Sequence, residues 1–108
     1  MRFWGLKTCD TCKKAQKALA DAGNTLEVVD VRADGVAPAD LARFYAAFGD
    51  AIVNKRSTTW RGLNEAERAG DPVALIAANP TLMKRPVVEM GDQMTLGWDA
   101  KARAVWGA

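Results

Sequence analysis

The sequence contains no histidine, only two cysteines and a single tyrosine among its 108 residues. Without an imidazole, neither a Ser-His-Asp triad nor a Cys-His nucleophile pair can be assembled. Two thiols, with no second cysteine pair to complete the ligand set, are too few for an ordinary structural zinc site. These absences exclude histidine-based catalysis, and we expect no metal centre.

The sequence also lacks a large excess of charge of one sign and any long apolar run. The net charge of +2 is too small to predict direct binding of nucleic acid. No apolar run is long enough for a transmembrane helix, and the N-terminus has no hydrophobic signal region, so we expect a cytoplasmic protein without membrane contact. The length and the apolar fraction of 49% predict a single domain over residues 1–108.

The first third of the chain predicts a β-α-β unit. The apolar run 2–6 indicates a buried strand, the segment 11–22 has helical periodicity, and the β-branched segment 26–31 indicates a second strand. Asp10 or Thr11 is expected to cap the helix. Its apolar face consists of Cys12, Ala15, Leu19 and Ala22. A strand-helix-strand crossover of this kind gives parallel strands.

The middle of the chain predicts a helical insertion over about 37–79. Pro38 and Pro72 stand where first helical turns begin, and a short helix is expected over 63–69. Residues 53–62 show no clear period and are rich in polar donors, so we expect a loop there.

The last quarter of the chain predicts a β-hairpin and a helix. Strands are expected over 86–90 and 93–96 with a tight turn between them, and a final helix over 99–106. The whole order is thioredoxin-like, an α/β fold with a mixed four-stranded sheet, although other α/β folds share the order.

A Cys-x-x-Cys sequence, Cys9 to Cys12, lies between the first strand and the first helix. This spacing favours redox chemistry in a cytosolic protein with a βαβ pattern. Cys9 precedes the first helical turn, where free N–H groups and the helix dipole favour a thiolate. Cys12 falls on the apolar face, as either a resolving thiol or a small buried hydrophobe. The alternative for both is a pair of packed structural cysteines.

Two further segments could bind an anion. Pro86 suits the first position of a strand, and in thioredoxin-like folds a proline here is typically cis and faces the reactive cysteine. Arg85 would then point toward the thiolate and bind a carboxylate or oxyanion, unless it is a solvated surface arginine. In the 53–62 loop, Asn54 and Arg56 could help cradle an anion, unless the loop is simply solvated.

Four motifs, in order along almost the whole chain, resemble those of the ArsC/Spx family of arsenate reductase relatives with a thioredoxin fold. They are the segments 4–15 (WGLKTCDTCKKA), 54–63 (NKRSTTWRGL), 79–88 (NPTLMKRPVV) and 96–98 (LGW). The sequence is most similar to the YffB-like branch, whose members are regarded as glutathione-dependent thiol reductases. Arsenate reductases of this family use a cysteine and three arginines. Cys9 and Arg85 match the cysteine and one arginine, whereas the other two arginine positions fall near Asn54 and Trp98.

The resemblance implies an ArsC-related thiol-disulfide reductase with Cys9 as the nucleophile and Arg85 beside it. It implies glutathione as co-substrate, glutaredoxin as a further partner and no permanently bound cofactor. The expected binding residues are Lys7, Thr8, Asn54, Arg56, Arg85 and Pro86. Two alternatives stay open: an Spx-like redox-sensing regulator that binds RNA polymerase, and a glutathione- and glutaredoxin-coupled arsenate reductase.

The small net charge conceals an uneven distribution. The segments 7–17, 54–61 and 84–86 contain nine basic residues and one acidic residue. If the fold brings these segments together, their field favours a thiolate and an anionic partner such as glutathione.

Overall fold

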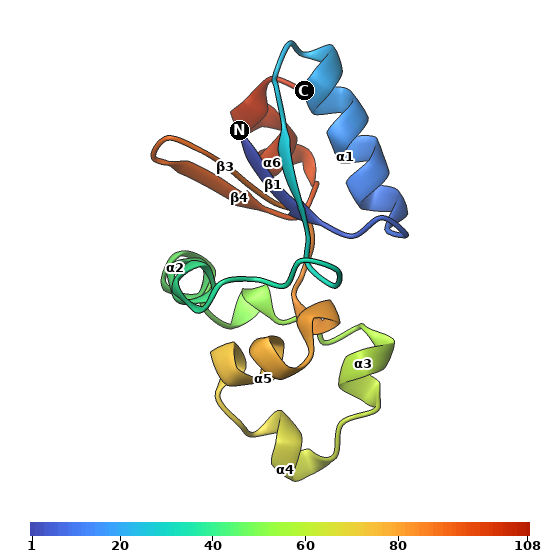
Figure 1. Cartoon of the computed structure of the whole chain (residues 1–108), viewed down its shortest axis with the longest axis vertical. Coiled ribbons are helices and arrows are strands. Elements are labelled where there is room, and N and C mark those ends of the chain that lie inside the picture. Colours follow the sequence, from blue (N-terminus) through green and yellow to red (C-terminus); the bar gives the residue numbers. More distant parts are fainter. The chain divides into compact units, whose positions relative to one another are not determined.

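A computed structural model describes all 108 residues and divides the chain into two compact units. The thiol unit consists of Met1–Val31 and Arg85–Ala108, and the helical unit of Arg32–Lys84 (Figure 1). The helical unit extends a few residues beyond each end of the insertion expected over 37–79. That the two units form one domain over 1–108 stays a prediction. None of the helices has the length and apolar character needed to cross a membrane.

The thiol unit contains the sheet. Its strands are β1 (Arg2–Gly5), β2 (Glu27–Asp30), β3 (Val87–Met90) and β4 (Gln93–Leu96), in the order β2-β1-β3-β4. Strand β1 pairs parallel with β2 and antiparallel with β3, and β3 and β4 form an antiparallel hairpin. Helix α1 (Asp10–Asp21) makes the crossover from β1 to β2, and α6 (Ala100–Trp106) ends the chain. The thioredoxin-like α/β fold with a mixed four-stranded sheet is confirmed.

One apolar cluster holds the thiol unit together. Its buried members are Phe3, Cys12, Ala15, Leu19, Val88 and Trp106. They come from β1, β3, α1 and α6, so both helices cover the same face of the sheet. The buried indole is satisfied, because Trp106 Nε1 donates to Thr95 Oγ1 at 2.7 Å. Cys12 therefore lies in the core, as the helical spacing of the apolar residues in segment 11–22 predicted.

The cap of α1 differs from expectation. The N-cap is Cys9, whose Sγ accepts from the Cys12 N–H at 3.3 Å, and not Asp10 or Thr11. The helix begins earlier because the Cys9 carbonyl already accepts the first helical hydrogen bond, from the Lys13 N–H at 3.0 Å. Cys9 keeps an extended backbone, as an N-cap does, while Asp10 is already helical and its carboxylate lies in the first turn.

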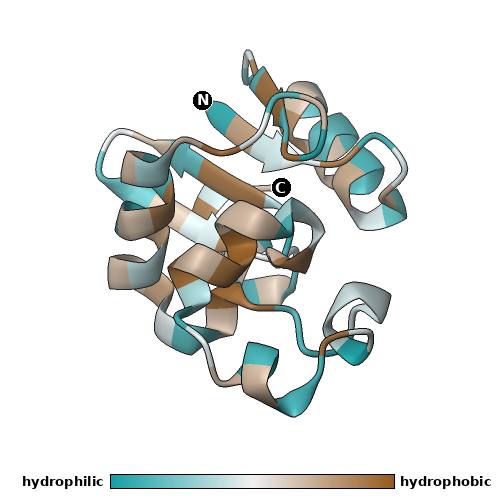
Figure 2. Cartoon of the chain, turned by 60° about the horizontal axis from the view of Figure 1, so that its bottom comes forward, coloured by the Kyte–Doolittle hydropathy of each residue, from teal (hydrophilic) through white to brown (hydrophobic).

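The helical unit is built from six short elements. They are α2 (Pro38–Phe48), η1 (Gly49–Ile52), α3 (Thr58–Arg61), α4 (Glu65–Arg68), α5 (Pro72–Ala78) and η2 (Pro80–Leu82). The expected helical starts at Pro38 and Pro72 and the short helix within 63–69 are confirmed. Helices α2 and α5 pack on each other and bury Phe44 and Ile76. Helix α4, in contrast, is mostly hydrophilic (Figure 2) and buries no residue.

The segment 53–62 is not entirely a loop, which corrects the expectation from its sequence. It contains the one-turn helix α3, capped by Ser57, whose Oγ accepts from the Trp60 N–H at 3.1 Å. The start of the segment is fixed by the Asn54 N–H, which donates to the Leu82 carbonyl at 2.8 Å. Four helical residues are too few to show a period, so the pattern alone could not predict this helix.

Candidate functional site

The turn that carries the first cysteine is positioned by the ends of two strands. The Cys9 N–H donates to the Leu6 carbonyl at 3.0 Å, and the Lys7 N–H donates to Asp30 Oδ2 at 3.3 Å. Lys7 and Thr8 are exposed on this turn, whereas Cys9 is partly buried. The thiol therefore stands at the surface on a backbone whose path is fixed.

The surroundings of Cys9 stabilise its thiolate. Burial by itself raises the pKa, but hydrogen bonds from the Cys12 thiol and the Cys12 N–H lower it. The Arg85 guanidinium lowers it further by its charge and by a hydrogen bond, so the net pKa of Cys9 lies below its ordinary value. A thiolate is the reactive form of cysteine, and this side chain is therefore suited to nucleophilic attack.

The second cysteine behaves in the opposite way. Cys12 is fully buried, and its pKa is raised to about 12 by burial first, then by its hydrogen bond to Cys9 and the charge of that thiolate. When the pair has lost one of its two protons, the remaining proton therefore stays on Cys12. Cys12 acts as a hydrogen-bond donor toward Cys9 in this state.

Arg85 and Pro86 lie on the thiol unit directly before β3. The Arg85–Pro86 peptide bond is cis. The guanidinium is within hydrogen-bond range of the Cys9 sulfur, and its Nε is buried. Pro86 is buried, and its carbonyl accepts from the Gly97 N–H at 2.8 Å, which ties the segment to the end of β4. A cation is thus held beside the thiolate by the sheet itself.

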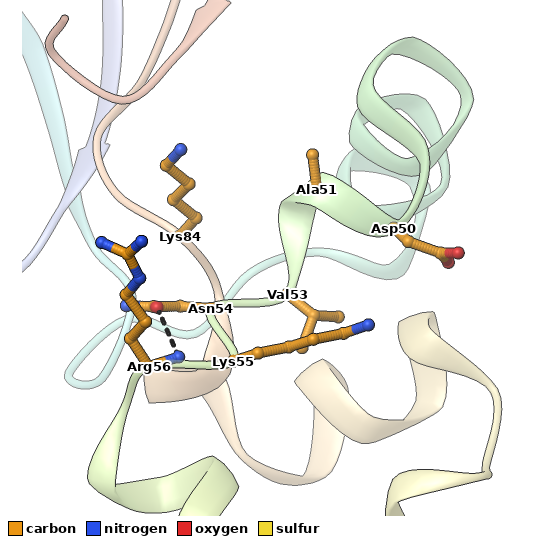
Figure 3. Close-up of a pocket in the computed structure, with 7 residues that line it drawn as sticks. All are labelled: Asp50, Ala51, Val53, Asn54, Lys55, Arg56 and Lys84. Atoms are coloured by element: carbon orange, nitrogen blue, oxygen red, sulfur yellow. Dashed lines mark hydrogen bonds between the residues drawn. The ribbon is translucent and has the colours of Figure 1, made fainter.

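The helical unit carries a polar groove of about 550 Å³ (Figure 3). It is lined by Asp50, Ala51, Val53, Asn54, Lys55, Arg56 and Lys84. The Asn54 Oδ1 accepts from the Arg56 N–H at 3.1 Å, which orients the amide. The side chains of Arg56 and Lys84 extend to the same side of the groove, while the Asp50 carboxylate points away from them. One end of the groove therefore presents hydrogen-bond donors and positive charge.

The expected site residues fall into two groups. Cys9, Cys12, Arg85 and Pro86 come together on the thiol unit, with Lys7 and Thr8 on the adjoining turn. Asn54 and Arg56 belong to the groove of the helical unit. No group of three or more histidine, cysteine, aspartate or glutamate side chains is placed to hold a metal ion.

Sequence reasoning missed Asp30, and it included Lys84 only as a member of the basic segment 84–86. Asp30, the last residue of β2, anchors the cysteine turn through the Lys7 N–H; its position at the carboxyl end of a strand parallel to β1 is the signal that could have found it. Lys84 lies in the groove because its N–H donates to the Ile52 carbonyl at 2.7 Å, a long-range contact with no local sequence signal.

Known proteins are similar to this chain in sequence, and solved structures are similar to it in fold. An uncharacterized protein of Haemophilus influenzae is 40% identical over 103 residues, covering 91% of this chain and 90% of that protein. The solved structure of a YffB protein matches with a TM-score of 0.90 and 33% identity, over 99% of this chain and 98% of that one. An arsenate reductase (ArsC) related protein from Brucella melitensis matches with a TM-score of 0.74 and 31% identity, over 99% and 94%.

A family model provides the assignment. The model of the ArsC family matches residues 4–104, which include both cysteines, the whole helical unit and most of α6. With this match and the relatives above 30% identity, the chain is a YffB-like member of the ArsC family.

Proposed function

We propose that this protein is a glutathione-dependent thiol-disulfide reductase in which Cys9 is the nucleophile. Membership of the ArsC family supports a reductase acting through a thiol. The observation that carries the proposal is the asymmetric cysteine pair, with the pKa of Cys9 lowered and that of Cys12 raised to about 12. One sulfur is thus prepared to attack while the other holds the proton.

The reaction is a pair of thiol-disulfide exchanges. The Cys9 thiolate attacks the glutathione sulfur of a mixed disulfide between glutathione and a substrate thiol. A Cys9–glutathione disulfide forms, and the substrate sulfur leaves as a thiolate that takes up a proton. A free glutathione thiolate then attacks the glutathione sulfur on Cys9, which releases oxidised glutathione and restores the Cys9 thiolate. The substrate sulfur is reduced, and the glutathione is oxidised.

External glutathione, rather than Cys12, is the resolving thiol. Once Cys9 is in a disulfide, its negative charge no longer raises the pKa of Cys12, but burial, the largest cause, remains. A buried protonated thiol is a poor nucleophile. Arg85 beside Cys9 supplies a partner for a carboxylate of glutathione. On the helical unit, the groove at Asn54 and Arg56 has hydrogen-bond donors and positive charge of its own that suit an anion.

The test is a glutathione turnover assay with a small mixed disulfide, in which oxidised glutathione is recycled at the expense of NADPH. We expect the wild type and Cys12→Ser to turn over, because a serine hydroxyl still donates toward Cys9, and Cys9→Ser to be inactive. Turnover by Cys9→Ser would contradict the nucleophile, and loss of turnover in Cys12→Ser would make Cys12 the resolving thiol. Capture of RNA polymerase without any turnover would favour the regulatory alternative.

A further inference from the structure

Gly5, the last residue of β1, packs against Cys12 of the cysteine pair. It has the same parity as Phe3 along the strand, so both residues face α1. A Cβ atom at position 5 would stand 2.7 Å from Phe3 Cε1 and 3.2 Å from Cys12 Sγ. Both distances are shorter than ordinary carbon–carbon or carbon–sulfur contacts, so the absent side chain is what leaves room for these two groups.

Neither neighbour can move away easily. Phe3 and Cys12 are both fully buried, and they belong to the same apolar cluster as Ala15, Leu19 and Val88. Cores are packed at close to crystal density, and an added methyl group forces side chains or backbone to shift. A side chain at position 5 would therefore displace the ring, the sulfur or both.

The sulfur that would be displaced is the one that contacts Cys9. The Cys12 thiol donates a hydrogen bond to Cys9, and the Cys12 Sγ itself accepts from the N–H of Leu6, the residue after Gly5. The Leu6 carbonyl in turn accepts from the Cys9 N–H at 3.0 Å. The end of β1 and the residue after it thus position both cysteines. Cys9 is held by the Leu6 carbonyl, and the Cys12 thiol lies in the space above Gly5.

We propose that Gly5 is a positioning residue for the reactive thiolate, since the space left by its missing side chain seats the Cys12 thiol in hydrogen-bond contact with Cys9. The inference rests on the proposed role of Cys9 as nucleophile. It concerns the state of that sulfur and not turnover, so it can be tested by alkylation even if the protein has no glutathione-dependent activity.

The experiment is the pH profile of Cys9 alkylation by iodoacetamide, with the labelled residue identified by mass spectrometry. We expect Gly5→Ala to move the profile to higher pH and to slow alkylation at pH 6.5 by roughly three- to tenfold. Weakening one hydrogen bond to the charged sulfur lowers the fraction of thiolate, and the greater nucleophilicity of the more basic thiolate partly offsets this loss. An unchanged profile in folded Gly5→Ala protein would overturn the proposal.

Gly62→Ala is the matched control. A Cβ at position 62 would meet the carbonyl oxygens of Thr58 and Thr59 at an ordinary 3.5 Å, and the φ of −78° suits alanine. We expect this variant to keep the wild-type alkylation profile. A shift as large as that of Gly5→Ala would overturn the proposal, because it would show that any glycine replacement perturbs Cys9.

A double-mutant cycle separates positioning from a general loss of packing. If Gly5 acts through Cys12, then Gly5→Ala changes the profile in the wild-type background and has no further effect in Cys12→Ala. An equal shift in both backgrounds overturns the proposal. Should Gly5→Ala fail to fold, the double variant Phe3→Leu/Gly5→Ala is compared with Phe3→Leu alone, because the leucine removes the contact with the ring and keeps the contact with the Cys12 sulfur. We expect the same shift of the alkylation profile in this comparison. Its absence would contradict the proposal.

Discussion

Two helices of this protein begin with the same hydrogen bond but differ in chemistry. Cys9 caps α1 by accepting from the Cys12 N–H at 3.3 Å, and Ser57 caps α3 by accepting from the Trp60 N–H at 3.1 Å. Helix α1 has 12 residues and α3 has four. Only the cap of α1 has a thiol, whose pKa lies below its ordinary value, and only it has a second donor and Arg85 beside it. A cap hydrogen bond by itself therefore stabilises a helix, whereas the Cys12 thiol and the Arg85 guanidinium beside the cap of α1 also stabilise a thiolate.

The largest effect is expected from Cys9→Ser, which gives α1 a serine cap like that of α3. Glutathione-dependent turnover should fall to the uncatalysed background, because a serine hydroxyl does not form a thiolate-like nucleophile here. The free energy of unfolding in urea should stay within about 0.5 kcal/mol of the wild type, because serine is a preferred N-cap residue. A large loss of stability would show that the sulfur holds the fold, which would contradict the comparison.

Removing the cation is expected to have the next largest effect. In Arg85→Gln, alkylation of Cys9 near neutral pH should slow by about tenfold, the effect of losing a hydrogen bond from a charged group. Arg85→Lys should recover part of the rate, because it keeps the charge but loses the planar donor geometry. The pH profile of alkylation measures both variants. Equal rates for glutamine, lysine and arginine would place the cause of Cys9 reactivity elsewhere.

A smaller effect is expected in the alkaline stability of the fold. The unfolded chain ionises Cys12 near its ordinary pKa of 9.0, whereas the folded chain does so only near 12. Its contribution to stability is therefore complete below pH 9 and is lost as the pH rises from 9 to 12. Urea unfolding across this range should show a shallower decline in Cys12→Ser than in the wild type. Parallel curves would mean that the Cys12 proton is not held by burial.

The smallest effect is expected at the other cap. Ser57→Ala should reduce the free energy of unfolding by about 1 kcal/mol, the usual cost of losing an N-cap side chain. It should leave the alkylation rate of Cys9 unchanged. Urea unfolding and the alkylation assay on the same preparation measure the two quantities. A change in Cys9 reactivity would show that the two caps are not independent.

The regular elements were predictable because they obey local rules. Three buried residues of α1, at helical spacing, give a clear period, and prolines at the first position mark α2 and α5. Helix α3 was not predicted, since one turn gives no period. The cap of α1 was assigned to Asp10 or Thr11 because propensity favours oxygen side chains. Propensity does not show that the Cys9 carbonyl accepts the first helical hydrogen bond, from the Lys13 N–H.

The sequence predicted which side chains come together, but not their energetics. The Cys-x-x-Cys spacing and the arginine before Pro86 pointed to side chains that lie together on the thiol unit. The division of labour between the cysteines depends on the burial of Cys12 and the proximity of Arg85, which are tertiary facts. The role of Gly5 was hidden for the same reason, because a glycine at the end of a strand signals close approach only when its neighbours across space are known.

The most direct test of the central claim is the pH dependence of alkylation in the unmodified protein, resolved by mass spectrometry into Cys9 and Cys12. If Cys9 is a stabilised thiolate and Cys12 its buried proton-bearing partner, only Cys9 is labelled at neutral pH, with a midpoint below that of a free cysteine in an unstructured peptide. A midpoint at or above that of the peptide, or equal labelling of the two cysteines, would contradict the account.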